Sequence, residues 1–345
     1  MENNTYMDPS FALAYSYYQI YCQADTATET GAQQSGSSSS SGDADISPSS
    51  EEPSPALWTT DSWTPAEEKA AQDVLALHAD KCQISPALQR QLPSDTQAWD
   101  RFYQQHQTNF FKDRHYLATA FPNEFTSPEP VKRTLVEIGC GVGNTLLPLI
   151  EDTERPEKMQ NRKIEWTVYG VDLSAVAIAL LKQDARFQRA AGRAWAGVAD
   201  LVRDGLPTVC HGQADVATLL FCLSAVAPDH HVAAARHAAQ ALRPNGVLVL
   251  RDYGRYDQAE LQLAVQRGKR LAPGYYVKHD QTKCYYFSTQ DLRRLFVEQL
   301  GLEELENGYI QRQYVNRGDG TRRRRVWVQA RFRLQAEQEG LTNGE

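Results

Sequence analysis

The glycine-rich stretch "EIGCGVGN", residues 137–144, constrains the fold of this chain more than any other feature. It follows the apolar run "TLVEIG" and leads into the helical pattern "NTLLPLIED". A strand that ends in glycines before a helix opens an α/β unit whose loop backbone approaches a ligand closely. Gly139, Gly141 and Gly143 have GxGxG spacing, whereas a dinucleotide site has GxGxxG. We therefore expect a nucleotide-type ligand and disfavour an NAD-dependent dehydrogenase.

Apolar runs and helical patterns continue to alternate after this loop. Helices are expected at residues 144–152, 174–187 (with Ser174 as its cap) and 228–242, and strands at 164–172, 195–200, 215–226 and 246–253. Continuous Val, Leu and Ile runs are typical of parallel strands covered on both faces by helices. After a helix at 291–300, strand-like runs at 308–315 and 325–334 flank an Asp-Gly pair, which is typical of a hairpin turn. The predicted fold is an α/β doubly wound sheet, mostly parallel, with a C-terminal antiparallel hairpin.

Charge and composition set the N-terminal part of the chain apart. Residues 1–68 contain no Lys or Arg and eleven acids, so all 36 basic residues lie beyond them, against 32 acids. Ser, Gly, Pro and acids dominate residues 31–55, which have too little apolar surface to fold. We predict a disordered acidic and Ser-rich tail over residues 1–60, and a second short tail over 336–345. The aromatic "FALAYSYYQIY" inside the first tail is either a docking motif or an incidental apolar patch.

Two helices are expected between this tail and the sheet. Thr64 and Glu67 have capping-box spacing at the start of the first. The second runs through "TQAWDRFYQQHQ", where Trp99 and Tyr103 share one face. Residues 61–133 are therefore predicted to form a helical extension.

The cysteines and the apolar runs limit where such a chain works. None of the six cysteines forms a CxxC pair or has metal-ligand spacing, which suits a reducing compartment and predicts no bound metal. No apolar run approaches the roughly 18 residues of a membrane span. The first residues resemble neither a secretory signal nor an Arg-rich transit peptide. We expect a cytoplasmic protein, with the nucleus as a second location, and no membrane partner.

Acidic residues follow two of the expected strands. Asp172 ends the second strand, where a carboxylate can bind both hydroxyls of a ribose. Asp200 follows the third strand, in a place suited to an adenine amino group. The polar insertion "DTERPEKMQNRK" explains why Asp172 lies 33 residues beyond Gly139 instead of about 20. Nucleoside binding at the carboxyl edge of the sheet is the favoured interpretation.

Six longer motifs add a resemblance to these patterns. They run in order from Trp99 to about Leu334: "WDRFYQQHQTNFFKDRH", "EIGCGVGNTLLPL", "YGVDLSAVAI", "LLFCLSAVAP", "LVLRDYGRYD" and "YYVKHDQTKCYYFS". The chain resembles the methyltransferase-like family that forms N3-methylcytidine in the anticodon loop of tRNAs, a branch of the class I S-adenosylmethionine-dependent methyltransferases. "FFKDRH" and "RDYGRYD" are its most specific motifs. The chain departs from the family pattern around "GVADLVRDGLP", where Val202 replaces a Thr, and at "TVCHGQAD".

The resemblance implies a cofactor, a partner and site residues. S-adenosylmethionine would contact the glycine loop and both strand-end acids, through Trp99, Tyr103, Gly139, Gly141, Gly143, Asp172, Asp200, Leu201 and Leu220. A Rossmann-like methyltransferase domain would span 134–335, with residues 61–133 covering the cofactor and contacting RNA. The implied partner is the anticodon stem-loop of tRNA, with an auxiliary protein or an aminoacyl-tRNA synthetase as a further candidate. Alternatively, Trp99 and Tyr103 only pin their helix to the core.

The stretch "TNFFKDRH", residues 108–115, is the expected RNA contact. Cytosine N3 lies on the Watson–Crick edge, so the target base must be unpaired. Aromatic rings can stack on bases and cations can meet phosphates; the residues assigned to RNA are Phe110, Phe111, Lys112, Arg114, His115 and Arg251. Asp113 is expected to orient Arg114. The alternative is a basic surface loop held by two core phenylalanines.

Asp252, in "RDYG" at the end of a strand, is the candidate catalytic residue. N3 of cytosine carries a lone pair, so the reaction does not need a general base. It needs the methyl donor and the cytosine held in line, and an electrostatic field that stabilises the positively charged product. An ion pair of Asp252 with an arginine is the alternative. The cluster "RRRR" at 322–325 is either solvated charge or added RNA affinity. A small-molecule methyltransferase, another RNA methyltransferase and a non-catalytic RNA-binding scaffold remain alternative functions.

Overall fold

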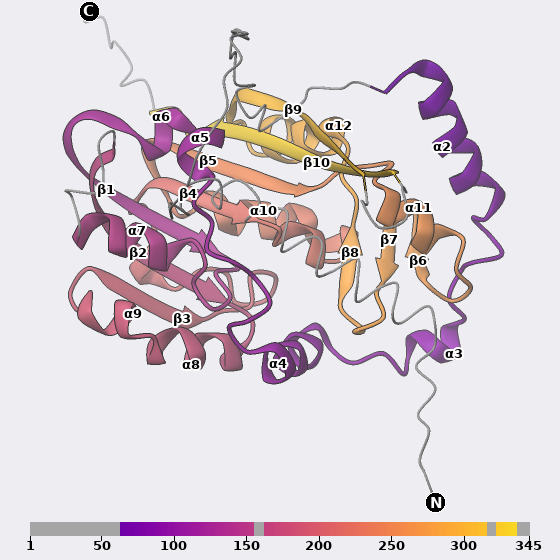
Figure 1. The fold of residues 1–345 in the computed structure, drawn as a ribbon, viewed down its shortest axis with the longest axis horizontal. Coiled ribbons are helices and arrows are strands. Elements are labelled where there is room, and N and C mark those ends of the chain that lie inside the picture. The colour runs from indigo at the N-terminus through magenta and orange to yellow at the C-terminus, as the bar shows by residue number, and fades with distance from the viewer. Residues whose placement is uncertain (1–62, 155–161, 316–321, 337–345) are drawn as a thin grey trace, which may run out of the picture. The chain divides into compact units, whose positions relative to one another are not determined.

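A computed structural model describes residues 63–154, 162–315 and 322–336 (Figure 1). All of them belong to one compact unit, Thr60–Glu345. The tail predicted over residues 1–60, the hairpin turn at 316–321 and most of the short tail at 336–345 lie outside the described residues. No helix within the described ranges is long and apolar enough to cross a membrane.

A seven-stranded sheet in the order β3-β2-β1-β4-β5-β10-β9 forms the centre of the fold (Figure 1). Its strands are β1 Ser127–Ile138, β2 Arg162–Asp172, β3 Ala194–Val198, β4 Ala214–Leu220, β5 Leu242–Tyr253, β9 Glu303–Val315 and β10 Arg322–Arg333. The first five strands pair in parallel, and β10 lies antiparallel between β5 and β9. The predicted mostly parallel, doubly wound sheet with an antiparallel C-terminal hairpin is therefore confirmed.

Helices cover both faces of this sheet. On β5, Leu248 and Leu250 belong to one apolar cluster and Val249 to the other, because successive side chains of a strand point to opposite faces. The first cluster includes side chains of α10 and of a π-helical turn, and the second includes side chains of α7 and α8. These elements are α7 Leu146–Glu154, α8 Ala175–Gln183, α9 Ala185–Arg189, α10 His231–Ala239, α12 Thr289–Arg293 and the π-turn Arg294–Glu298.

Local backbone chemistry accounts for three departures from the expected boundaries. The helix expected at 174–187 begins after its predicted cap, Ser174, but breaks at Asp184, which is extended and caps α9 instead. The strand expected at 215–226 stops at Leu220 because Phe221 adopts a left-handed φ of 56°. The helix expected at 291–300 loses its regular pattern after Arg293 and continues as a π-turn.

Helices occupy much of the chain from Pro65 to Phe125, and the first strand of the sheet begins at Ser127. Both expected helices are present and start with capping boxes, Thr64 with Glu67 and Ser94 with Gln97. The extension consists of α2 Pro65–Leu77, α3 Pro86–Gln89, α4 Asp95–His106, α5 Leu117–Ala120 and α6 Pro122–Phe125. A three-stranded antiparallel sheet was not expected from the sequence. It follows α11 Gln258–Ala264 and comprises β6 Arg270–Ala272, β7 Tyr275–Val277 and β8 Lys283–Tyr285.

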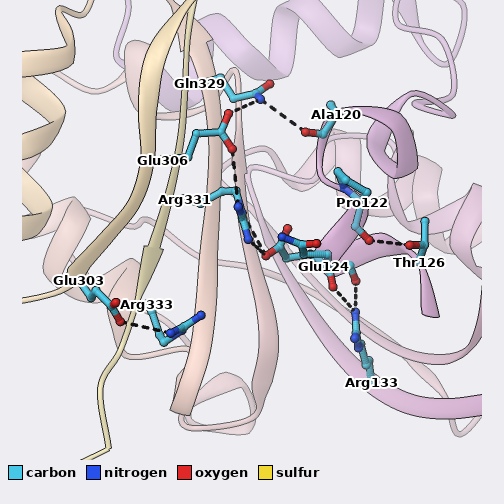
Figure 2. A network of polar contacts seen from close by, with 11 residues as sticks. Ala120, Pro122, Glu124, Thr126, Arg133, Glu303, Glu306, Gln329, Arg331 and Arg333 are labelled. Carbon is cyan, nitrogen blue, oxygen red and sulfur yellow. Dashed lines mark hydrogen bonds and ion pairs between the residues drawn. The ribbon is translucent and has the colours of Figure 1, made fainter. Parts of the chain in front are cut away.

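A polar network joins the hairpin to the turn between α5 and α6 (Figure 2). Arg331 of β10 contacts Glu124 at 2.6 Å and Glu306 at 3.8 Å. Gln329 donates to Glu306 at 2.7 Å and to the carbonyl of Ala120 at 3.5 Å. The segment that follows "FFKDRH" is thereby fixed to the last strand of the chain.

Two of the four arginines at 322–325 also have protein partners. Arg324 pairs with Glu67 of α2 at 2.8 Å, and its guanidinium carbon lies 4.1 Å from the ring centroid of Trp63. Arg325 pairs with the fully buried Asp257 at 2.8 Å. These two side chains hold the extension and α11 against β10, so the cluster is not simply solvated charge.

Candidate functional site

The three loop glycines adopt conformations and contacts that larger residues tolerate poorly. Gly139, Gly141 and Gly143 have φ values of 74°, 53° and 89°, in the left-handed region that costs other residues about 1–2 kcal/mol. A Cβ on Gly139 would lie 2.4 Å from Sγ of Cys222, and one on Gly141 would lie 2.5 Å from the hydroxyl of Tyr103. The loop between β1 and α7 thus presents bare backbone at the carboxyl edge of the sheet.

Asp172 at the end of β2 is bonded to this loop. Its Oδ2 accepts the amide of Gly141 at 2.8 Å, and its Oδ1 accepts the amide of Ser174 at 2.8 Å. Burial raises the pKa of Asp172 to about 6, although the bonds from Ser174 and Gly141 oppose the rise. Each oxygen keeps a further lone pair, so the carboxylate is fixed in place and can still accept ligand hydroxyls.

Glu137, just before the first loop glycine, is a candidate site residue that the sequence analysis did not select. Its side chain is 2 % exposed, and its Oε2 has no hydrogen-bond partner within the described residues. Burial raises the pKa of Glu137 to about 7, and the nearby charge of Arg114 limits the rise. Buried polar atoms without a partner are rare and call for an explanation, such as a ligand. The available signal was an acid at the end of a strand that leads into a glycine loop.

Trp99 and Tyr103 lie on α4, which packs against α8. Tyr103 is buried, and its hydroxyl lies beside Gly141. Trp99 is half-buried, with its ring 6.0 Å from that of Tyr103 and 5.9 Å from Nζ of Lys278. The geometry suits both their predicted cofactor contact and their structural alternative, because Tyr103 also belongs to an apolar cluster with Phe102.

The predicted adenine side of the site is engaged with its own backbone. Asp200 accepts the amides of Val202 at 2.9 Å and Arg203 at 3.2 Å, and the Arg203 side chain at 2.7 Å. Burial raises the pKa of Asp200, but Arg203 and the two amides outweigh this effect and hold it below the ordinary value. Leu201 and Leu220 lie in the apolar clusters on the two faces of the sheet. Cofactor contacts of these three residues stay predictions.

The "FFKDRH" segment packs on α4 and hydrogen-bonds to the glycine loop. The rings of Phe110 and Phe111 lie 4.6 and 5.8 Å from that of Phe102. Lys112 and His115 are exposed, so their predicted phosphate contacts are sterically accessible. Base stacking by the two phenylalanines and phosphate binding by the two cations remain predictions.

The side chain of Arg114 reaches the end of β4, and its phosphate contact stays a prediction. Its guanidinium is half-buried, donates to the carbonyl of Leu220 at 3.1 Å and lies 5.5 Å from the ring centroid of Phe221. Its charge lowers the pKa of both Glu137 and Asp252. The side chain therefore enters the site at the end of β4. Asp113, which was expected to orient Arg114, forms an ion pair with Arg186 at 2.7 Å.

Arg251 and Asp252 at the end of β5 are both buried, and burial argues against the phosphate contact predicted for Arg251. Arg251 is 2 % exposed, donates to Gln329 at 3.1 Å and lies 4.7 Å from the ring centroid of Tyr116, so it cannot meet RNA phosphates in this conformation. Asp252 is 0 % exposed and accepts the amides of Ser224 at 2.9 Å and Tyr253 at 2.9 Å. Burial raises the pKa of Asp252 to about 6. Its carboxylate holds the turn after β4, and its role beside the target base stays a prediction.

Comparison with known proteins identifies the family. The family described as "Methyltransferase domain" matches residues 103–307. The tRNA N(3)-methylcytidine methyltransferase Mettl2 of Drosophila melanogaster is 34% identical over 280 residues, which cover 80% of this chain and 82% of that protein. The tRNA N(3)-cytidine methyltransferase METTL6 of Homo sapiens is 35% identical over 263 residues, which cover 74% of this chain and 86% of that protein. The tRNA N(3)-methylcytidine methyltransferase trm140 of Schizosaccharomyces pombe is 32% identical over 240 residues, which cover 68% of this chain and 73% of that protein.

These similarities agree with the glycine loop, the strand-end Asp172 and the "FFKDRH" motif that the structure brings together, and they confirm the resemblance found in the sequence. This chain belongs to the family of tRNA N(3)-cytidine methyltransferases.

Proposed function

We propose that this chain transfers a methyl group from S-adenosylmethionine to N3 of a cytidine in the anticodon loop of tRNA. The observation that carries the proposal is the direct bonding of the "FFKDRH" segment to the glycine loop. The amide of Arg114 donates to the carbonyl of Asn144 at 2.8 Å, and the side chain of Asn144 donates to the carbonyl of Phe111 at 3.0 Å. A basic and aromatic segment beside a nucleotide-type loop suits an RNA substrate, whereas a small-molecule methyltransferase has no use for it.

The residues at the carboxyl edge fit S-adenosylmethionine. The left-handed glycines let the backbone of the loop turn sharply at this edge, in a conformation and at contacts that exclude larger residues. Asp172 is fixed by two amides and has the lone pairs to accept two ribose hydroxyls. Glu137 has a buried oxygen with no hydrogen-bond partner among the residues that the structure describes, which suits an ammonium group. When bound, S-adenosylmethionine supplies an electrophilic sulfonium methyl.

The protein's contribution to the reaction is placement and charge. The N3 lone pair of cytosine is available at neutral pH, so no side chain has to remove a proton first. Holding acceptor and donor in line is worth up to about 7–11 kcal/mol. Arg114, at the end of β4, is suited to donate to the O2 carbonyl of cytosine. The carboxylates of Glu137, Asp172 and Asp252 give this edge a negative field, which stabilises positive charge as it passes to the base.

The test is methylation of an anticodon stem-loop by the purified chain. N3-methylcytidine is measured by mass spectrometry on a stem-loop with cytidine at the target position and on one with uridine there. We expect product only from the first, and product from the chain alone would show that no auxiliary protein is required. Product that appears only after addition of cell extract would indicate a partner. No product under either condition, despite normal cofactor binding, would contradict the proposal.

Asp172→Ala tests the cofactor part separately. Loss of charge-assisted bonds to two hydroxyls should weaken S-adenosylmethionine binding by about 2–4 kcal/mol while the fold survives. The exposed Asp204→Ala is the matched control and should bind as the wild type does. Equal calorimetric affinities of Asp172→Ala and wild type would remove Asp172 from the site.

A further inference from the structure

Arg186 of α9 stands at the centre of a charge cluster outside the site described above. Its guanidinium lies 2.7 Å from Oδ2 of Asp113, 3.0 Å from Oδ2 of Asp184 and 3.6 Å from Oε2 of Glu151. The side chain of Arg186 is 24% exposed, and its partners come from the "FFKDRH" segment, the start of α9 and α7. Solvent screens such a partly buried group less than a surface pair.

Asn144, the last residue of the glycine loop, holds the same segment from the other side. Its side-chain amide donates to the carbonyl of Phe111 at 3.0 Å and to Oδ1 of Asp113 at 3.3 Å. Its carbonyl accepts the amide of Arg114 at 2.8 Å. Asp113 is therefore gripped by Asn144 on one oxygen and by Arg186 on the other. The next residue, Arg114, extends to the carbonyl of Leu220.

We propose that Arg186 is a positioning residue that, with Asn144 and Asp113, couples tRNA binding to cofactor binding. This inference rests on the proposed function. A cofactor on the glycine loop fixes Asn144, which fixes the "FFKDRH" segment in the arrangement that receives RNA. Arg186 strengthens the coupling because it binds Oδ2 of Asp113, the oxygen that Asn144 does not bind. The "FFKDRH" segment and the glycine loop then move together as one rigid unit. Binding linkage is reciprocal, and RNA must strengthen cofactor binding by the same factor.

Loss of the Arg186 side chain should leave α9 in place. The cap of this helix is a bond from the backbone amide of residue 186 to Asp184 at 2.8 Å, which any residue except proline can make. Arg189 provides a matched control on the same helix. It is 53% exposed and pairs at 3.6 Å with Glu154, which belongs to α7 and not to the "FFKDRH" segment.

The experiment compares Arg186→Gln with Arg189→Gln in the full chain. Affinity for an anticodon stem-loop is measured with and without saturating S-adenosylhomocysteine, and cofactor affinity is measured by calorimetry. In the wild type we expect the cofactor analogue to tighten RNA binding about 5- to 20-fold. Arg186→Gln should reduce this factor to about two or less while cofactor affinity in the absence of RNA stays within about twofold. Arg189→Gln should keep the wild-type factor, and Arg186→Lys should restore it in part.

Asp113→Asn provides a second route to the same answer. If the two side chains act together, the double variant Asp113→Asn with Arg186→Gln should lose no more coupling than Arg186→Gln alone. Wild-type coupling in Arg186→Gln, equal loss in Arg189→Gln, or no coupling in the wild type would each overturn the inference. A wild-type chain that binds cofactor but methylates no stem-loop would instead overturn the proposed function, so the two failures can be told apart.

Discussion

The two halves of the site are held together on different length scales. On the cofactor side, Asp172 binds the amides of Gly141 and Ser174, which belong to its own and the adjacent βα turn. On the basic side, partners lie far apart in the chain: 78 residues separate Arg251 from Gln329, and 257 separate Arg324 from Glu67. The role of a loop glycine is set by the local backbone conformation. The role of these two arginines depends on which distant acceptor the fold places next to the guanidinium.

The strongest test of the cofactor half is Gly139→Ala. The new Cβ needs both a left-handed φ of 74° and space already held by Cys222, so we expect loss of roughly 2–4 kcal/mol of stability and of measurable cofactor binding. Gly192→Ala is the control, because φ is 86° there and no atom lies within 4 Å. It should lose only the conformational part, about 1–2 kcal/mol. Equal losses in denaturant unfolding would show that contact with Cys222 is unimportant.

Arg251→Met tests whether a buried arginine of the basic half serves the fold and not RNA. Removing the guanidinium takes away the bond that Oε1 of the buried Gln329 accepts from Arg251, and should cost about 2–4 kcal/mol of unfolding free energy. The salt dependence of RNA binding should stay as in the wild type. Lys182→Met, at an exposed position, should change stability by less than about 0.5 kcal/mol. A flatter salt dependence of RNA binding in Arg251→Met would instead indicate that Arg251 contacts a phosphate.

Glu137→Gln should change how stability depends on pH. Burial raises the pKa of Glu137 from 4.5 to about 7, so the folded chain binds this proton more tightly than the unfolded chain. The contribution of Glu137 therefore makes wild-type stability fall as pH rises through that window, and the variant should lack this part of the fall. The difference should reach about 1–3 kcal/mol by pH 8. Parallel urea-unfolding profiles from pH 5 to 8 would mean that Glu137 is not buried in its charged form.

Lys112→Ala should have the smallest effect, and it concerns RNA alone. One fewer cation at phosphate should lower the log–log salt slope of stem-loop binding by about one unit. Cofactor affinity should be unchanged. Arg324→Gln, whose parent side chain pairs with Glu67, should leave the slope as it is. If Arg324→Gln flattens the slope and Lys112→Ala does not, then Arg324 contacts phosphate and Lys112 does not, which contradicts the prediction.

Patterns confined to one or two adjacent elements could be predicted from the sequence. Thr64 and Ser174 were recognised as helix caps because a cap acts on amides up to three residues away. The sheet followed from apolar runs separated by helices, and the glycine loop and Asp172 followed from the first two of those runs. Each of these features is specified by nearby residues.

Features that depend on distant partners could not be predicted. The motif that contains Arg251 and Asp252 marked a strand end correctly, but nothing next to it shows that Gln329 and Ser224 occupy both side chains. The strands β6, β7 and β8 have three residues each, too few to show a period of two. For Glu137, the sequence indicates that the carboxylate lies at the end of a strand. It does not show that Oε2 has no hydrogen-bond partner among the described residues.

The position of β10 has a consequence for synthesis of the chain. The strand Arg322–Arg333 leaves the ribosome after the other six strands of the central sheet, yet it pairs on both sides, with β5 and with β9. Until it emerges, β5 exposes one unpaired edge, and an open edge of an apolar strand favours aggregation. Arg331 and Gln329 also bring the α5–α6 turn into its final place only at that moment. A message truncated shortly before codon 322 would therefore yield a chain that contains every cofactor residue and still cannot close its sheet.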